Sequence, residues 1–316
     1  MATEDAERAA PLPEVPASGG AAPAGPTEVK IASSESLTFE EVGQFLCAQA
    51  GTLVALLGDR DSGKSTLICS IYDRFLHGPF AGCESSGIRT ITGLERRAHL
   101  ERLDSGRDTP ETQHTSIAEG LQYFHFPVVP HDTGRRTDLL ISDRAGELYK
   151  DARGNSALVE QLIEVPAADY IVILLDGARL ASTVLRAGAF FAVRQSLQML
   201  TDWNVLGATD RVQVVTSKID LIKGAVDATA LNERLTDFRE KLVRDFGSKL
   251  GQLEFLEISA RDPKGKYPAA HGVDVLLKSW LEGPKARIRV AAVPVPIVTE
   301  FDKLSVRPEV SEGQNA

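Results

Sequence analysis

Residues 52–66 read Thr-Leu-Val-Ala-Leu-Leu-Gly-Asp-Arg-Asp-Ser-Gly-Lys-Ser-Thr, an apolar run followed by a glycine-containing turn. From Gly58 onward the stretch follows G-x-x-x-x-G-K-S and opens into a helical pattern. This pattern, between a buried strand and a helix, is that of a phosphate-binding P-loop. The turn is expected to bind phosphate through these residues: Gly58, Asp59, Arg60, Asp61, Ser62, Gly63, Lys64, Ser65 and Thr66.

Each residue type in the loop has a physical reason. Glycines let backbone N–H groups approach phosphate oxygens closely, and the N-terminus of the following helix directs its dipole at the same anion. Lys64 would bring a mobile cation to the β- and γ-phosphates, and the Ser65 hydroxyl would ligate Mg²⁺. We therefore expect a nucleoside triphosphate and Mg²⁺ to bind here, with Lys64 as a catalytic residue.

The bulk composition is that of a globular protein. The 316 residues are 43% hydrophobic and 25% charged, with a net charge of −9. An acidic surface does not attract nucleic acid or anionic lipid, so neither is expected as a partner. Three cysteines without C-x-x-C spacing indicate free thiols in a reducing compartment. The chain shows no apolar run of ~20 residues and no apolar signal core. These features predict a cytoplasmic protein.

The two ends of the chain differ in composition from its middle. Residues 1–35 are rich in Ala, Pro, Gly and Glu, and a disordered tail is expected there. Residues 36–284 are expected to form the globular domain, with a polar insert at 78–117. Residues 285–316 carry a Val/Ile/Pro run, which the prolines restrict to an edge or extended segment, and then a polar tail. They are expected to be a C-terminal extension.

Strand-like and helical patterns alternate through the domain. The sequence Thr38-Phe39-Glu40-Glu41 has the capping-box pattern of a helix start. Strands are expected at 52–57, 121–128, 138–141, 170–175, 212–216 and 255–258. Further helices are expected at 64–77, 94–103, 180–203, 227–250 and 273–281. This alternation predicts an α/β fold, a three-layer P-loop NTPase with a mostly parallel sheet and helices on both faces.

Three further motifs follow predicted strands in order. They are Asp143-Arg144-Ala145-Gly146, a D-x-x-G pattern, then Ser217-Lys218-Ile219-Asp220, and finally Ser259-Ala260. With these motifs and the P-loop, the chain resembles the translation-factor-like (TRAFAC) GTPases over roughly residues 50–283. Its long segment before the D-x-x-G pattern is similar to that of bacterial double-GTPase type domains.

The resemblance implies GTP or GDP with Mg²⁺ as the ligands. The Asp220 carboxylate would accept hydrogen bonds from guanine N1–H and the 2-amino group, which adenine cannot offer. Lys218 would lie along the base, and the backbone N–H of Ala260 would meet guanine O6. Asp143 would hold Mg²⁺ through water, and the Gly146 N–H would contact the γ-phosphate.

Three positions depart from the family pattern, and one of them is Arg261, which replaces the common Lys after the Ser-Ala motif. Ser217 and Ser259 are both expected at the nucleotide. Because Ser217 replaces the usual Asn, its contact to base N7 and its tie to the P-loop are expected to be weaker or absent. Glu147 stands where Ras-like proteins carry the Gln that orients water. A carboxylate beside the γ-phosphate is repelled unless it is protonated or paired. Glu147 is therefore expected to be either a catalytic base or a cap of the following segment.

Two roles in the site are left open among several residues. Switch I requires a threonine for the Mg²⁺ shell, and Thr112 is the first choice, Thr115 the second, with Thr109 also available. Arg60 and Arg144 lie within motifs and are the candidates for an arginine that stabilises the transition state.

These observations predict a Mg²⁺-dependent GTPase that hydrolyses GTP to GDP and phosphate slowly without a partner. It would act as a molecular switch or assembly regulator, with a protein partner or a second copy at the switch regions. One alternative is a non-hydrolysing GTP-binding interaction module, which Glu147 and Ser217 favour. The other is a P-loop ATPase or small-molecule kinase, against which Asp220 and the Ser-Ala motif argue.

Overall fold

The computed structural model describes residues 35–85, 87–101, 120–202, 211–250, 252–262 and 265–282 of the chain. All of them belong to one compact unit. Apart from Glu35, the tail expected at 1–35 lies outside the described residues, as do the three switch I threonines and the extension expected at 285–316.

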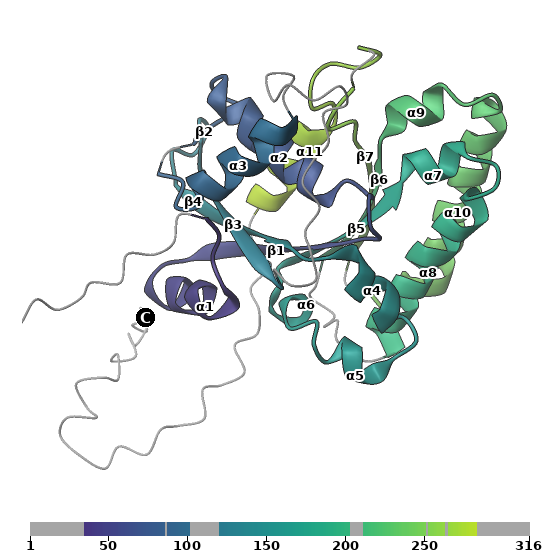
Figure 1. The fold of residues 1–316 in the computed structure, drawn as a ribbon, viewed down its shortest axis with the longest axis horizontal. Coiled ribbons are helices and arrows are strands. Elements are labelled where there is room, and N and C mark those ends of the chain that lie inside the picture. Colours follow the sequence, from purple (N-terminus) through teal and green to yellow (C-terminus); the bar gives the residue numbers. More distant parts are fainter. Residues whose placement is uncertain are drawn as a thin grey trace, which may run out of the picture. The chain divides into compact units, whose positions relative to one another are not determined.

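A seven-stranded sheet forms the middle layer of the described part of the chain, in the order β2-β3-β4-β1-β5-β6-β7 (Figure 1). The strands are β1 Gly51–Leu57, β2 Cys83–Ser85, β3 Gln122–Pro130, β4 Thr137–Asp143, β5 Tyr170–Asp176, β6 Arg211–Ser217 and β7 Gln252–Glu257. Strands β4, β1, β5, β6 and β7 run parallel, whereas β3 is antiparallel to β4 and to β2. The expected α/β architecture with a mostly parallel sheet is confirmed.

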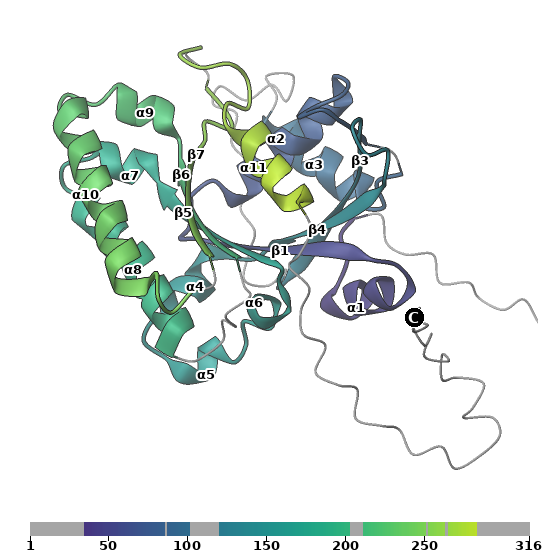
Figure 2. The same cartoon turned by 180° about the vertical axis from the view of Figure 1, so that it is seen from behind.

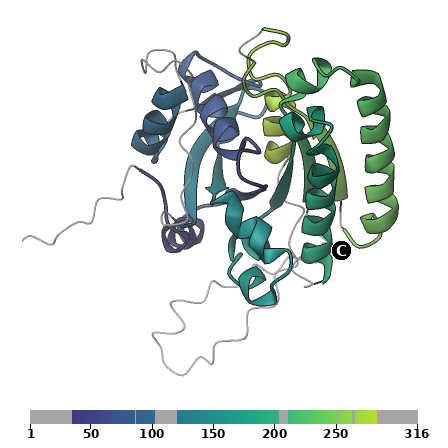
Figure 3. The ribbon, with the colours of Figure 1, turned by 45° about the vertical axis from the view of Figure 1, so that its right-hand side comes forward.

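Helices cover both faces of this sheet (Figures 1 and 2). One face packs against α2 Lys64–Leu76, α3 Ile91–Glu101 and α11 Val273–Leu281. The other face carries α1 Phe39–Ala48, α4 Gly146–Ala152, α5 Ser156–Val159, α6 Glu164–Ala167, α7 Gly177–Ala181, α8 Arg186–Asp202, α9 Ile219–Lys223 and α10 Ala228–Phe246. Figure 3 shows α8 in teal and α10 in green side by side on that face. Among the described residues, none of the helices combines the length and apolarity needed to cross a bilayer.

Strand β1 shows how the sheet feeds two cores. Leu53, Ala55 and Leu57 point into the core beneath α8 and α10, and Val54 and Leu56 point into the core beneath α2 and α11. Successive side chains of a strand alternate between faces, and a strand buried on both faces reads as a continuous apolar run. The P-loop therefore starts from one of the most buried segments of the molecule.

The helix expected at 180–203 is instead two helices, α7 and α8, separated by residues 182–185. The Arg186 side chain explains the break. Its Nε donates to the Leu180 carbonyl at 2.7 Å, and its two terminal nitrogens donate to the Asp227 carboxylate at 2.6 and 2.9 Å. The guanidinium thus satisfies a carbonyl at the end of α7 and fixes the start of α8 against α10.

Local sequence patterns predicted the start of α1 and both ends of α11 correctly. In the capping box of α1, Glu41 N donates to Thr38 Oγ1 at 3.2 Å and Thr38 N donates to Glu41 Oε2 at 2.8 Å. Helix α11 has the expected bounds. Strand β2 was not expected, because three residues carry no periodicity and this strand forms only by pairing with β3.

Candidate functional site

The motifs meet at the carboxyl ends of the parallel strands. The P-loop follows β1, the D-x-x-G motif begins at the last residue of β4, and Ser-Lys-x-Asp begins at the last residue of β6. Ser259 follows β7 by two residues. Ligands of open α/β sheets bind in the crevice outside these strand ends, so the topology places all four motifs at the edge where a nucleotide would lie.

The P-loop curves around the Lys64 ammonium. Gly63 adopts a left-handed conformation with φ of +99°, which glycine tolerates without cost, immediately before α2 begins. Lys64 is buried, and its Nζ donates to the carbonyls of Gly58 at 2.9 Å and Asp59 at 3.1 Å. Burial lowers the pKa of Lys64, while the charges of Asp143 and Asp59 oppose that shift. The cation is thus held at the position where a phosphate would compete for it.

Ser65 and Asp143 provide a fitting pair of oxygens for Mg²⁺. The Ser65 hydroxyl donates to the Asp143 carboxylate at 3.2 Å, and Asp143 is fully buried. Mg²⁺ is usually held by one or two carboxylates together with phosphates and water. The described residues contain no cluster of three or more His, Cys, Asp or Glu side chains suited to a metal. The pair is therefore consistent with a metal that shares its shell with a nucleotide.

Gly146 of the D-x-x-G motif lies directly against the P-loop. A Cβ at this position would be 2.3 Å from the backbone nitrogen of Arg60 and 2.5 Å from the carbonyl carbon of Asp59. Real Cβ atoms do not approach backbone so closely, so only glycine fits. Helix α4 consequently begins in contact with the loop that would hold the phosphates.

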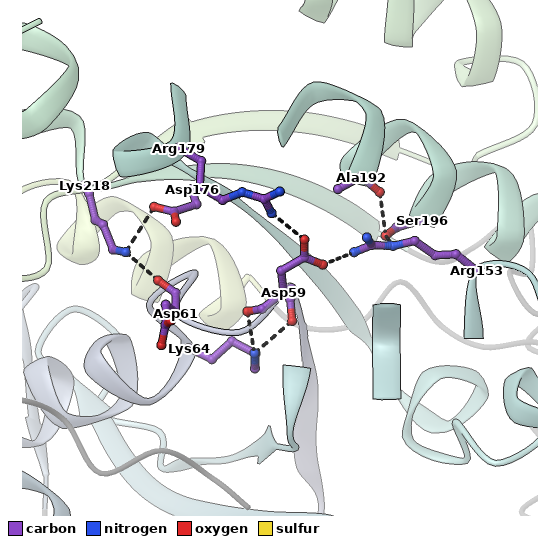
Figure 4. Close-up of polar contacts among 10 residues, drawn as sticks. Asp59, Asp61, Lys64, Arg153, Asp176, Arg179, Ala192, Ser196 and Lys218 are labelled. Atoms are coloured by element: carbon purple, nitrogen blue, oxygen red, sulfur yellow. Dashed lines mark hydrogen bonds and ion pairs between the residues drawn. The ribbon is translucent and has the colours of Figure 1, made fainter. Parts of the chain in front are cut away.

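Asp59 uses its two halves differently. Its backbone carbonyl faces Lys64, but its carboxylate points away, between the guanidinium groups of Arg153 and Arg179 (Figure 4). Burial alone would raise the pKa of Asp59, but hydrogen bonds and charge from the two arginines outweigh it and hold the pKa below its usual value. Only the backbone of Asp59 is therefore available to a phosphate.

The Ser-Lys-x-Asp loop is tied to the P-loop. The Ser217 hydroxyl donates to the Ser62 carbonyl at 2.8 Å. The Lys218 ammonium contacts the carbonyl of Asp61 and lies 3.1 Å from Asp176 Oδ1 (Figure 4). The expected weakness of the tie at Ser217 is therefore wrong, because the shorter hydroxyl still reaches the loop. The weak contact to base N7 remains a prediction.

The two loops expected at the base also meet each other. The Ser259 hydroxyl donates to Asp220 Oδ1 at 2.9 Å, and both residues are buried. Lys266 Nζ donates to the backbone carbonyl of Asp220 at 2.8 Å. Ala260 follows Ser259 directly, so its backbone lies beside the Asp220 loop, where its expected contact to a base remains a prediction.

Arg144 does not face the phosphate site. Its Nη1 donates to the Gln161 carbonyl at 2.8 Å, and its Nε lies 3.5 Å from Glu164 Oε1. Glu164 is fully buried and also accepts from the Tyr149 hydroxyl at 2.9 Å. Burial raises the pKa of Glu164, and the charge of Arg144 opposes the shift. A buried carboxylate needs a paired cation, and Arg144 meets that need instead of serving the nucleotide.

Arg60 and Glu147 form an ion pair across the site. Arg60 Nη1 lies 3.4 Å from Glu147 Oε1, and the two side chains are 60% and 36% exposed. Glu147 lies in the first turn of α4. The carboxylate thus has a cationic partner, which is one of the two conditions under which it could lie beside a γ-phosphate.

Sequence reasoning missed Arg97 in α3. Its buried guanidinium places Nε 3.8 Å from Asp143 Oδ2, and its Nη2 donates to Gln122 Oε1 at 2.7 Å. The residue belongs to the insert and to no motif, so no local signal connects it to the site.

The chain is similar to a known protein family and to several solved structures. The family model named Double-GTPase 2 matches residues 52–281. A search of curated proteins gave no match. Similar solved structures include a bacterial selenocysteine-specific elongation factor, EF-Sec (17% identity, 74% of this chain, TM-score 0.37). They also include Aquifex aeolicus Era bound to GDP and AlF4⁻ and the Arl6 small GTPase of Trypanosoma brucei with GppNp. Each of these two has 18% identity, covers 74% of this chain and has a TM-score of 0.37.

The chain spans 29% of the length of EF-Sec, 57% of Era and 96% of Arl6. At these TM-scores the likeness carries no conclusion about substrates or partners. The family match, by contrast, runs from β1 to the end of α11 and includes all four motifs. The chain belongs to the double-GTPase 2 family and is a TRAFAC-class P-loop GTPase domain.

Proposed function

We propose that the chain binds GTP with Mg²⁺ and hydrolyses it slowly to GDP and phosphate, as a switch or assembly regulator. The observation that carries this proposal is the direct contact between the expected base loop and the phosphate loop. Ser217 and Lys218 both donate to P-loop carbonyls. A base held by the first loop would therefore have its phosphates within reach of the second.

The phosphate half has a role for each charged group. Lys64 would exchange its carbonyl partners for β- and γ-phosphate oxygens. Ser65 and Asp143 would hold Mg²⁺, which when bound would neutralise charge on the phosphate oxygens. Glu147, with its charge partly balanced by Arg60, would orient the attacking water or accept its proton.

Guanine specificity would come from Asp220. A carboxylate offers about four lone-pair sites, and the Ser259 hydroxyl occupies one of them. The remaining sites suffice for guanine N1–H and the 2-amino group. Adenine offers neither donor and would leave a buried charge unpaired, which can discriminate by about 10⁴-fold or more.

Nucleotide binding by the purified chain tests this assignment. Wild type should prefer GTP over ATP, and Asp220→Asn should lose GTP and gain xanthosine triphosphate. Xanthine carries a C2 carbonyl, to which the new amide can donate. Asp237→Asn, an exposed change on α10, is the matched control and should keep the GTP preference. ATP binding as tightly as GTP, or an unchanged preference in Asp220→Asn, contradicts the assignment.

The runner-up is a GTP-binding module that does not hydrolyse. Glu147 carries a carboxylate in place of the usual amide, and this favours the module. Its ion pair with Arg60 could simply hold α4 against the P-loop, with no role in hydrolysis. Single-turnover phosphate release separates the two functions. Release that disappears in Lys64→Ala supports the GTPase, and no release from bound GTP supports the module.

We also propose a cytoplasmic location and a protein partner, or a second copy, that contacts the switch regions. The net charge of −9 supports a partner other than nucleic acid or a membrane surface. Size measurements of the chain bound to GDP or to a non-hydrolysable GTP analogue test for the second copy.

A further inference from the structure

Helix α4 is attached to the P-loop at both of its ends. At its start, Gly146 lies against the backbone of Asp59 and Arg60. Just after its last turn, the Arg153 guanidinium contacts the Asp59 carboxylate. The same loop residue thus meets both ends of the seven-residue helix that carries Glu147.

The second attachment is well shielded from water. The side chains of Asp59 and Arg153 are 15% and 9% exposed. Arg153 Nε also donates to Ser196 Oγ on α8 at 3.1 Å, and that hydroxyl donates to the Ala192 carbonyl at 3.0 Å (Figure 4). The guanidinium is therefore fixed on two sides, and its position depends on both Asp59 and α8.

Arg179 links the same carboxylate to a third element. It extends from α7, and its Nη1 lies 2.5 Å from Asp59 Oδ2. Asp176, one turn earlier, lies 3.1 Å from the Lys218 ammonium, which contacts the carbonyl of Asp61. Helix α7 is therefore linked to the P-loop twice, directly through Arg179 and indirectly through Asp176 and Lys218 (Figure 4).

We propose that Asp59 is a positioning residue that holds α4, and with it Glu147, in place relative to the phosphates. The inference rests on the proposed function and deepens it. Asp59 would not contact the nucleotide through its side chain. Its carboxylate fixes the Arg153 end of α4, so that a movement of Gly146 toward a γ-phosphate turns the helix about a held end.

The proposal separates two kinds of effect. GDP lacks the γ-phosphate, so its affinity depends on the P-loop and the base loops and only weakly on α4. Turnover depends on where Glu147 lies, and a misplacement of about 1 Å can cost about 100-fold. Asp59→Asn should therefore reduce turnover about tenfold or more and leave GDP affinity nearly unchanged. A merely structural role would lower both together.

The test uses the full chain in matched variants. Asp59→Asn and Arg153→Met remove the ion pair from its two ends, and Asp59→Glu and Arg153→Lys restore the charge. Asp245→Asn, which removes the α10 carboxylate paired with Arg194, is the control. GDP affinity, single-turnover phosphate release and amide exchange of residues 146–153 are measured for each.

The supporting result has four parts. Turnover falls in Asp59→Asn and Arg153→Met, GDP affinity is kept, exchange across α4 rises about tenfold, and the charge-retaining variants recover part of the loss. Unchanged exchange of α4 in both neutral variants, or equal losses of GDP affinity and turnover, overturns the proposal. If Asp59→Asn does not fold, Arg153→Met against Arg153→Lys decides alone.

Failure of the proposed function would look different. A wild-type chain that releases no phosphate contradicts hydrolysis, but amide exchange in the nucleotide-free protein still reports whether Asp59 holds α4. Faster exchange in the neutral variants then supports the attachment, and unchanged exchange refutes it.

Discussion

Strand β4 carries a buried aspartate near each end, and the two serve different purposes. Asp138 accepts hydrogen bonds from Arg136 Nη2 at 2.7 Å and from His125 Nε2 at 2.8 Å. Asp143, at the other end, accepts from the Ser65 hydroxyl at 3.2 Å, and the nearest approach of Arg97 is 3.8 Å. Both carboxylates are almost completely inaccessible to solvent, so burial alone does not distinguish them.

The difference lies in the kind of partner. The exposed Arg136 and the buried His125 both donate to the Asp138 carboxylate at hydrogen-bond distance. The contacts of Asp143 include the hydroxyl of Ser65, the residue expected to share Mg²⁺ with it, and the guanidinium of Arg97. Asp138 therefore contacts a residue of β3 and a residue of the adjacent turn, whereas Asp143 contacts the P-loop serine that is expected to share Mg²⁺ with it. The comparison therefore supports a structural role for Asp138 and agrees with the metal-binding role proposed for Asp143.

Removing the charge of Asp143 should produce the largest effect on function. In Asp143→Asn the proposed Mg²⁺ site loses the carboxylate that accepts from Ser65, and a catalytic metal contributes several kcal/mol to a transition state. Phosphate release at saturating GTP should fall about 1,000-fold, or about 4 kcal/mol. Single-turnover assays across a Mg²⁺ titration measure it. If Asp138→Asn loses as much turnover per folded molecule as Asp143→Asn, the two aspartates do not have the different roles argued here.

The P-loop of the candidate site could be located from the sequence because it is contiguous. Residues Gly58 to Ser65 are consecutive in the sequence, and their residue types predict phosphate binding even when the fold is not known. The alternating apolar runs likewise predicted the parallel sheet, since strands buried on both faces, such as β5, are uniformly apolar. The three-residue strand β2 is too short to show such a pattern, so the sequence did not predict it.

The partners of the motif side chains could not be predicted. Nothing in the sequence pairs Asp59 with Arg153 or Arg179, because these contacts depend on how α4 and α7 return to the P-loop. The D-x-x-G motif made Arg144 one of two candidates for an arginine at the phosphates, yet its guanidinium lies against the buried carboxylate of Glu164. Such pairings are decided by burial, which a single sequence does not specify.

Removing Asp138 should affect stability rather than function. In Asp138→Ala the buried His125 N–H loses its acceptor, which costs about 1–3 kcal/mol. The ion pair with Arg136, a side chain that is 48% exposed, adds at most about 1 kcal/mol. Urea unfolding should show the free energy of unfolding reduced by this sum. Asp132→Ala on the adjacent turn is the control, and equal destabilisation by the two changes would refute the structural role.

The smallest predicted effect concerns the pH dependence of stability at the Asp138 end. The backbone N–H of Arg89 donates to His125 Nδ1 at 3.2 Å, so the proton lies on Nε2 and the ring is neutral. Burial lowers the pKa of His125, and hydrogen bonding and charge from Asp138 oppose that shift without cancelling it. The native state therefore binds fewer protons than the unfolded chain. Stability is present above the ordinary pKa of about 6.5 and is lost as pH falls below it.

For one proton, the free energy of unfolding cannot change by more than about 1.4 kcal/mol per pH unit. Urea unfolding of wild type and His125→Gln at pH 7.5 and 5.5 should show that the difference in stability between them narrows at the lower pH. Taking the difference cancels the opposite contribution of Glu164, whose pKa is raised by burial and whose contribution is lost as pH rises. His77→Gln, on an exposed side chain, is the control for replacing a histidine with glutamine. A difference between wild type and His125→Gln that is independent of pH would mean that His125 titrates normally in the fold, and that its bond to Asp138 belongs to a charged imidazolium.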